Sequence, residues 1–234
     1  MSDKRIFLVR HGLSEGNVDK TLYGKTFNSD IKLTERGKED SRNAAKRITD
    51  LCKELHGLKQ GLYDNYIPAI RNFDEIHMYF AMFHSPYARA AETADIIDCE
   101  MNQRLRINQK ESNPLIRERE WGNLRHTVGQ LPKYSEERDK LFHFFRRPEG
   151  GESFADTYQR ALLFDMWMTT HSRFDNNIVV AHGEFNKVYM MYLLGWTIEE
   201  FEKYKSPKNG EVFLIENGRL SKSTPLTLKI KTMV

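Results

Sequence analysis

Cysteine is almost absent from this chain of 234 residues, which holds only Cys52 and Cys99. The two are isolated from each other and belong to no cluster with histidine, so neither a disulfide framework nor a structural zinc site is indicated. Long apolar runs are missing too, since none approaches the roughly 18 residues of a membrane span. A strand expected from Ile6 onward leaves no room for a signal peptide before it. We therefore expect a cytoplasmic protein without a membrane span.

A strong excess of either charge is also lacking. The 36 lysines and arginines exceed the 33 aspartates and glutamates by only three, which favours anionic ligands weakly and gives no support to nucleic-acid binding. Hydrophobic residues make up 39% of the chain, and 14 glycines and 7 prolines are too few for a collagen-like or low-complexity protein. At roughly 100 to 200 residues per domain, we expect one globular domain spanning residues 1–234.

Four short apolar runs have the length and composition of buried strands: residues 6–9, 79–83, 178–181 and 212–215. Small or polar residues that open a helical pattern follow these runs. Alternation of strands and helices is typical of βαβ units. The sequence therefore predicts an α/β protein.

Several residues are placed to begin helices. Thr34 precedes apolar residues that recur at helical spacing between positions 44 and 55. Ser85 offers an N-cap, and Pro86 would then occupy the first helical position. Arg89 would consequently lie in the first turn of that helix, near the end of the preceding strand.

Later segments give less uniform indications. Ser153, three residues before Asp156, resembles the start of a capping box. Residues 57–72 contain two glycines and a proline and show no sustained period, so we expect a long connection or insertion there. Residues 225–231 alternate well enough to form an edge strand.

The tripeptide Arg10-His11-Gly12 directly follows the first expected strand. Ligands of open α/β sheets bind beyond the carboxyl ends of the strands, so this position is a candidate site. Glycine lets backbone amides approach an anion, arginine offers a planar fork to phosphate oxygens, and histidine can act as base, acid or nucleophile. A lone histidine at a strand end is more often structural, so the tripeptide alone is a weak indication.

The same arrangement recurs where the apolar run at residues 178–181 leads into His182 and Gly183. If the two strands are parallel neighbours, His11 and His182 face one crevice, and Arg89 reaches it from the end of a third strand. Two arginines and two histidines would then converge. Arginines beside the ligands would repel a cation, so the cluster favours an oxyanion clamp over a metal site.

Five segments, in this order, carry a resemblance: LVRHG with Ser14 and Asn17 in residues 8–17, SPYARAAETA at 85–94, LIREREWG at 115–122, GES at 151–153 and VAHG at 180–183. They are similar to the motifs of the histidine phosphatase superfamily, the phosphoglycerate mutase-like proteins. The resemblance runs from about residue 5 to about residue 215. It implies a three-layer α/β/α fold with a mostly parallel central sheet.

The resemblance also implies a double displacement at His11, which attacks phosphorus, forms a phosphohistidine and yields it to water. Arg10, Arg89 and His182 would hold the phosphoryl oxygens, and Gly183 would belong to the same phosphate site. A neutral imidazole is a competent nucleophile near pH 7, and cationic groups stabilise the charge on a transferring phosphoryl group. No metal and no cofactor is expected.

Glu118 matches the acidic position of the family motif and would protonate the leaving oxygen and later take a proton from water. Glu120 is the nearby alternative, and either glutamate could instead be half of a surface ion pair. By the same resemblance, Asn17 would form a hydrogen bond within the phosphate pocket, and Ser14 would help to shape the loop. Serine and asparagine are also ordinary turn residues.

The choice between hydrolysis and mutase chemistry depends on departures from the family pattern. Cofactor-dependent mutases carry a tryptophan-containing segment after the first motif, whereas residues 22–28 contain no tryptophan. Residues 144–153 and 195–202 look more like the plant and fungal mutase-like proteins. We therefore expect a phosphatase. The first alternative is a phosphoglycerate mutase, and the second is a non-catalytic protein that binds a phosphorylated ligand.

The sequence does not name the substrate beyond an anionic phosphorylated small molecule or a phosphoprotein. Scattered basic residues could meet the rest of such a substrate, but they are more typical of a solvated surface and are left outside the expected site. They are Arg125, His126, Arg146 and Arg147.

Overall fold

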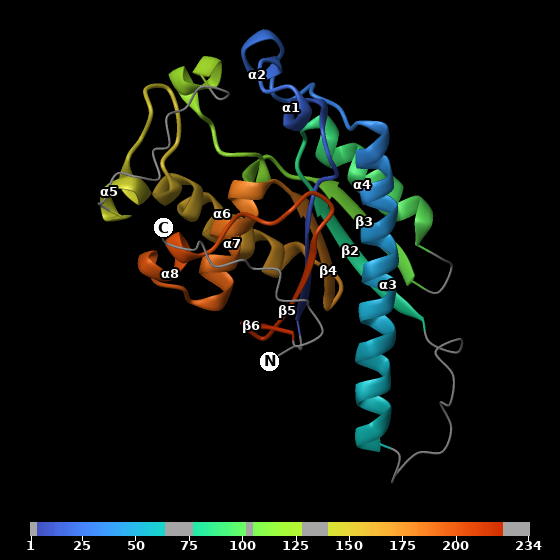
Figure 1. Ribbon diagram of the computed structural model, residues 1–234. Coiled ribbons are helices and arrows are strands. Elements are labelled where there is room, and N and C mark those ends of the chain that lie inside the picture. Colours follow the sequence, from blue (N-terminus) through green and yellow to red (C-terminus); the bar gives the residue numbers. More distant parts are fainter. Residues whose placement is uncertain (1–3, 64–76, 102–104, 128–139, 222–234) are drawn as a thin grey trace.

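A computed structural model describes residues 4–63, 77–101, 105–127 and 140–221 (Figure 1). The strands in these ranges form one sheet in the order β3-β2-β4-β1-β5-β6. Their bounds are β1 Arg5–Arg10, β2 Met78–His84, β3 Leu105–Ser112, β4 Asn176–Ala181, β5 Val212–Glu216 and β6 Arg219–Leu220. The first four strands in that order run parallel, whereas β5 and β6 are antiparallel to their neighbours. The expectation of a mostly parallel sheet is confirmed.

Helices cover both faces of the sheet (Figure 1). The described helices are α1 Glu15–Val18, α2 Leu22–Lys25, α3 Glu35–Tyr63, α4 Ala88–Glu100, α5 Lys140–Phe145, α6 Phe154–His171, α7 Gly183–Leu194 and α8 Ile198–Lys203, with 3-10 turns η2 Pro114–Ile116 and η3 Gly122–Thr127. Along β1, Phe7 and Val9 pack into the core with α3 and α4, and Ile6 and Leu8 into the core with α6 and α7. This alternation, the period of a strand, gives the predicted three layers.

The long helix α3 begins as predicted, because the Thr34 hydroxyl accepts a hydrogen bond from the N–H of Gly37 at 3.0 Å. Its end was predicted wrongly. Residues 57–63, read as the start of a connection, continue the helix to Tyr63. Interior glycines cost about 1 kcal/mol each relative to alanine, and the leucine, lysine and glutamine between them favour the helix enough to offset this. Residues 64–72 and 225–231 lie outside the described residues.

Helix α4 begins two residues later than predicted. Tyr87, not Ser85, is the N-cap, and Ala88 is the first helical residue. Ser85 is instead buried, and its hydroxyl makes contacts at the carboxyl end of the sheet. Arg89 still lies in the first turn, as expected. In the described ranges, no helix is long and apolar enough to cross a membrane.

Candidate active site

Strands β1 and β4 are parallel neighbours, and Arg10 lies opposite Ala181 in their register. The next residue on each strand is a histidine. The N–H of His11 donates to the carbonyl of Ala181 at 3.0 Å, and the His11 and His182 rings lie edge to face with centroids 5.1 Å apart. Parallel pairing therefore brings together two histidines that are 171 positions apart in the chain.

The ring of His11 is almost fully buried and is held in one tautomer. Its Nδ1 lies 2.7 Å from the carbonyl oxygen of Gly12, which can only accept, so Nδ1 carries the proton. Nε2 keeps its lone pair and accepts from Nε of Arg89 at 3.3 Å. Burial, reinforced by the cations of Arg89 and Arg10, lowers the pKa of His11 well below its ordinary value. The imidazole is therefore neutral, with a basic Nε2.

The loop after β1 leaves no room for a side chain at position 12. A Cβ on Gly12 would lie 2.0 Å from the carbonyl oxygen of Gly37 in the first turn of α3, and a Cβ on Gly37 would lie 2.0 Å from that of Leu13. The N–H of Gly12 donates to the Thr93 hydroxyl at 3.1 Å. Asn209 Nδ2 donates to the carbonyls of His11 and Gly12 at 3.1 and 3.2 Å. The loop that bears His11 is thus fixed from three directions.

Two arginines lie beside His11 and are tied to backbone carbonyls. Arg10 Nη1 donates to Pro207 at 2.5 Å, and Arg89 Nη1 donates to Asn28 at 2.6 Å. Nε of Arg10 is buried without a partner among the described residues. A Cβ on Gly183 would lie 3.0 Å from Cζ of Arg10, so glycine there leaves the guanidinium its place. Both guanidinium groups thus lie beside His11, and Arg10 lines the cavity with its Nε unpaired among the described residues.

His182 is fully buried and anchored at one ring nitrogen. Its Nε2 lies 2.8 Å from the hydroxyl of Ser85, which also accepts the N–H of Tyr87 at 3.3 Å. Nδ1 is buried without a partner among the described residues. Burial, followed by the charge of Arg89, lowers the pKa of His182 well below its ordinary value, so the ring is neutral. Because Ser85 Oγ already accepts the N–H of Tyr87, we assign its own proton to Nε2 of His182, which leaves the ring proton on Nδ1.

Glu118 lies between η2 and η3, and its carboxyl lines the cavity at His11. Burial first, and then the neighbouring charge of Glu184, raise the pKa of Glu118, while Arg89 and the N–H of Arg119 oppose the rise. Glu120, the alternative from the sequence, is paired with Arg125 at 2.5 Å and is not among the residues that line this cavity. Of the two glutamates, only Glu118 is among the residues that line this cavity.

The cavity has a volume of about 130 Å3. It is lined by Arg10, His11, Asn17, Lys20, Tyr23, Asn28, Glu118, Trp121, Arg125, Gly183, Glu184 and Ser206. Arg89 and His182 contact His11 but are not among the lining residues. The structure thus brings together the residues that the sequence singled out, and adds cationic and aromatic side chains that no sequence motif marked, such as the exposed Lys20 and the half-buried Tyr23.

Asn17 is oriented by its own hydrogen bonds. Its Oδ1 accepts from the N–H of Ser14 at 3.1 Å, from the Ser14 hydroxyl at 3.0 Å and from Asn209 Nδ2 at 3.0 Å. The amide NH2 group is therefore the part of Asn17 that remains for a ligand. Ser14 shapes this loop, as expected, whereas Asn209 was missed because no pattern around it differs from an ordinary turn.

The basic residues set aside in the sequence divide between several environments. Arg125, which we left outside the expected site, lines the cavity. Arg146 lines a neighbouring cavity of about 320 Å3, which shares Trp121, Glu184 and Ser206 with the first. Arg147 pairs with Asp156 at the surface. The side chain of His126 lies outside the described residues.

Comparison with known proteins points to one family. Residues 6–54 and 69–221 match the profile of the histidine phosphatase superfamily (branch 1). The chain is 32% identical to a phosphoglycerate mutase-like protein of Arabidopsis thaliana, over 93% of this chain and 75% of that protein. It is 27% identical to a broad-range acid phosphatase of Saccharomyces cerevisiae, over 90% of this chain and 84% of that protein.

A solved structure shares the fold. It is that of a mycobacterial glucosyl-3-phosphoglycerate phosphatase in complex with VO3, which aligns with a TM-score of 0.61 at 18% identity, over 93% of this chain and 97% of that one. The matched profile names a single family. The sheet order and the paired histidines at the carboxyl edge of the sheet agree with that family. The chain belongs to the histidine phosphatase superfamily.

Proposed function

We propose that the protein is a phosphatase that hydrolyses a phosphate monoester of a small molecule through a phosphohistidine on His11. The observation that carries this proposal is the state of that imidazole. It is neutral, its Nδ1 proton is held by the Gly12 carbonyl, and its Nε2 lone pair lies beside Arg89. A buried neutral histidine surrounded by cations suits attack on a phosphoryl group better than it suits storage of a proton.

In the first step, Nε2 of His11 gives up the hydrogen bond from Nε of Arg89 and attacks phosphorus as the bond to the leaving oxygen breaks. The charge of the transferring phosphoryl group is spread over its other oxygens, where preorganised donors stabilise it. The donors with spare capacity are Nε of Arg10 and Nδ1 of His182, together with the guanidinium of Arg89. The proposal assigns the phosphoryl oxygens to these three residues, with the Asn17 amide and the backbone at Gly183 beside them.

Glu118 is assigned the proton transfers. Its raised pKa keeps a larger share of the carboxyl protonated near neutral pH, so it can give a proton to the leaving oxygen. The carboxylate that results then takes a proton from water as the water attacks the phosphohistidine. The second step releases inorganic phosphate, restores neutral His11 and returns Glu118 to its acid form.

A colorimetric assay with 4-nitrophenyl phosphate tests the proposal, with His11→Ala measured beside the natural protein. Hydrolysis by the natural protein and its loss in His11→Ala are expected. A rapid-quench experiment with a 32P-labelled monoester should then recover label on His11 in an acid-labile, alkali-stable form. Equal hydrolysis by both proteins, or label on another residue, would exclude His11 as the nucleophile.

The same protein samples can distinguish a phosphatase from a mutase and from a non-catalytic binding protein. A mutase would interconvert 2- and 3-phosphoglycerate when primed with a bisphosphate, with little release of inorganic phosphate. A non-catalytic binding protein would bind inorganic phosphate in a titration, but it would neither hydrolyse the monoester nor interconvert the phosphoglycerates. The presence of both a neutral nucleophile and a buried acid supports turnover, since binding alone requires neither.

A further inference from the structure

Glu118 has little to hold it in place by itself. In the described part of the chain, its carboxylate accepts one hydrogen bond, at 3.0 Å from the N–H of the adjacent Arg119. It lies in an irregular segment between two 3-10 turns, Pro114–Ile116 and Gly122–Thr127. A proton donor that is displaced by about 1 Å can lose on the order of a hundredfold in rate. Something other than secondary structure has to fix this segment.

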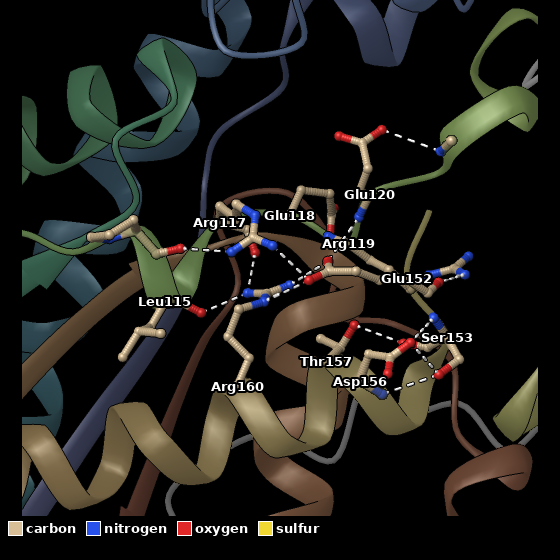
Figure 2. Close-up of polar contacts among 12 residues, drawn as sticks. Leu115, Arg117, Glu118, Arg119, Glu120, Glu152, Ser153, Asp156, Thr157 and Arg160 are labelled. Atoms are coloured by element: carbon tan, nitrogen blue, oxygen red, sulfur yellow. Dashed lines mark hydrogen bonds and ion pairs between the residues drawn. The ribbon is translucent and has the colours of Figure 1, made fainter. Parts of the chain in front are cut away.

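We propose that the buried ion pair between Arg160 and Glu152 positions Glu118 for proton transfer by clamping the peptide groups on both sides of it. The inference rests on the proposed function of Glu118 as general acid and base. Arg160 and Glu152 themselves do not line the cavity and are positioning residues. Figure 2 shows the Arg160 side chain reaching from helix α6 to the segment around Glu118.

Arg160 holds the side of the segment that precedes Glu118. Its Nη1 donates to the carbonyl of Leu115 at 2.5 Å and to the carbonyl of Arg117 at 2.9 Å. The second of these carbonyls belongs to the peptide bond that joins Arg117 to Glu118. Arg160 is only 7% exposed, so water does not compete effectively for these bonds.

Glu152 holds the side of the segment that follows Glu118. Its Oε2 accepts the N–H of Glu120 at 3.0 Å, and its own N–H donates to the Glu120 carbonyl at 2.8 Å. The backbone carbonyl of Glu152 also accepts Nη1 of Arg119 at 3.0 Å. The two residues that follow Glu118, Arg119 and Glu120, are therefore both bound to Glu152 of the GES segment.

The pair itself is rigid. Nε and Nη2 of Arg160 donate to the two carboxylate oxygens of Glu152 at 3.1 and 2.8 Å, a bidentate contact that fixes the plane of both groups. Arg117 Nη2 adds a third contact to Oε1 at 2.6 Å. One guanidinium thus links two carbonyls to one carboxylate, and a lysine ammonium, being a point charge, cannot span all three.

The test uses two substrates of similar size whose leaving groups differ in basicity, 4-nitrophenyl phosphate and phenyl phosphate. A general acid matters most for the more basic phenolate. Its loss or displacement therefore lowers kcat/KM for phenyl phosphate more than for 4-nitrophenyl phosphate. A merely structural defect would reduce both values by the same factor. The value of kcat/KM reports the first step, in which the leaving oxygen departs.

The variants are Arg160→Lys and Glu152→Gln, compared with Glu118→Gln. We expect Arg160→Lys to lower kcat/KM for phenyl phosphate by about 10- to 100-fold and for 4-nitrophenyl phosphate by less than about threefold. Glu152→Gln keeps the shape of the side chain and one acceptor oxygen. Like Arg160→Lys, it should lower kcat/KM for phenyl phosphate more than kcat/KM for 4-nitrophenyl phosphate. If circular dichroism shows that the Arg160→Lys protein is unfolded, Glu152→Gln alone serves as the test.

Arg147→Lys is the matched control. Arg147 also makes a bidentate contact with an acidic residue near the start of α6, Asp156, but binds no atom of residues 115–120. Equal losses on both substrates in the Arg160 and Glu152 variants, with selective loss in Glu118→Gln, would overturn this inference and leave the proposed function standing. A Glu118→Gln protein without selective loss would instead refute the assignment of Glu118 itself.

Discussion

Removing the Ser85 hydroxyl should impair the role of His182 as a hydrogen-bond donor, although His182 itself is not substituted. Ser85 is fully buried, and its Oγ accepts the N–H of Tyr87 and lies 2.8 Å from Nε2 of His182, to which we assign the hydroxyl proton. In Ser85→Ala, that Nε2 loses its partner in a site closed to water. The ring then either keeps an unsatisfied acceptor or moves its proton to Nε2, which turns Nδ1 from a donor into an acceptor facing the phosphate.

The size of the effect follows from these contacts. An unsatisfied buried polar group costs about 1 to 3 kcal/mol, which sets the expected fall in the free energy of unfolding. Loss of one preorganised donor to an oxyanion costs about 100- to 1000-fold in rate. The His182 ring remains in place and retains its donor tautomer in part of the population. We therefore expect kcat/KM to fall by about 10- to 100-fold, less than the complete loss of a donor would cause.

Long-range 1H–15N NMR spectra of the histidine rings give the direct assay, because they report which nitrogen carries the proton. The natural protein should show His182 protonated at Nδ1, and Ser85→Ala should show partial or complete transfer to Nε2. Ser172→Ala is the control. Its hydroxyl, near the start of β4, donates to the Phe174 carbonyl at 3.0 Å and is remote from the site. An unchanged tautomer together with unchanged kcat/KM in Ser85→Ala would refute the reasoning.

Three other outcomes are expected. In pH profiles with phenyl phosphate, kcat/KM should fall as pH rises through the raised pKa of Glu118, since only the protonated carboxyl donates; the same limb in Glu118→Gln would assign it to another group. Gly183→Ala should weaken inhibition by inorganic phosphate by roughly tenfold, because its methyl group crowds Cζ of Arg10; undiminished inhibition would show that Arg10 does not bind phosphate. The hydrogen bond from Arg147 lowers the pKa of Asp156 to about 2. Because this folded-state pKa is depressed, the associated stability is present above the unfolded value of about 4 and is lost as pH falls toward 2, so urea unfolding should show a smaller acid loss in Arg147→Gln.

The elements at the centre of the sheet could be predicted because they are buried on both faces. Runs such as residues 6–9 and 178–181 are continuously apolar, and the residues that follow them necessarily lie at the carboxyl edge. Strand β3, Leu105–Ser112, was missed because it lies at the edge of the sheet and only one of its residues, Leu105, is buried. Its sequence alternates too weakly to stand out from a polar loop.

The residues of the site likewise fall into those that the sequence predicts and those that it does not. His11 and His182 could be found because each follows a buried strand and precedes a glycine. Asn209 and Lys20 could not, because their importance lies in tertiary contacts that no local pattern encodes. Ser85 was misread because serine before proline is a common helix start, whereas its burial against His182 overrides that preference.

The paired glycines at positions 12 and 37 have a consequence for the variation that this chain can accept. Each would drive a methyl group into the backbone of the other's segment, and backbone cannot rotate aside as a side chain does. Replacement at one position therefore cannot be rescued by a smaller residue at the other, since neither has anything left to remove. If both codons were randomised and clones selected for turnover, every survivor should encode glycine twice.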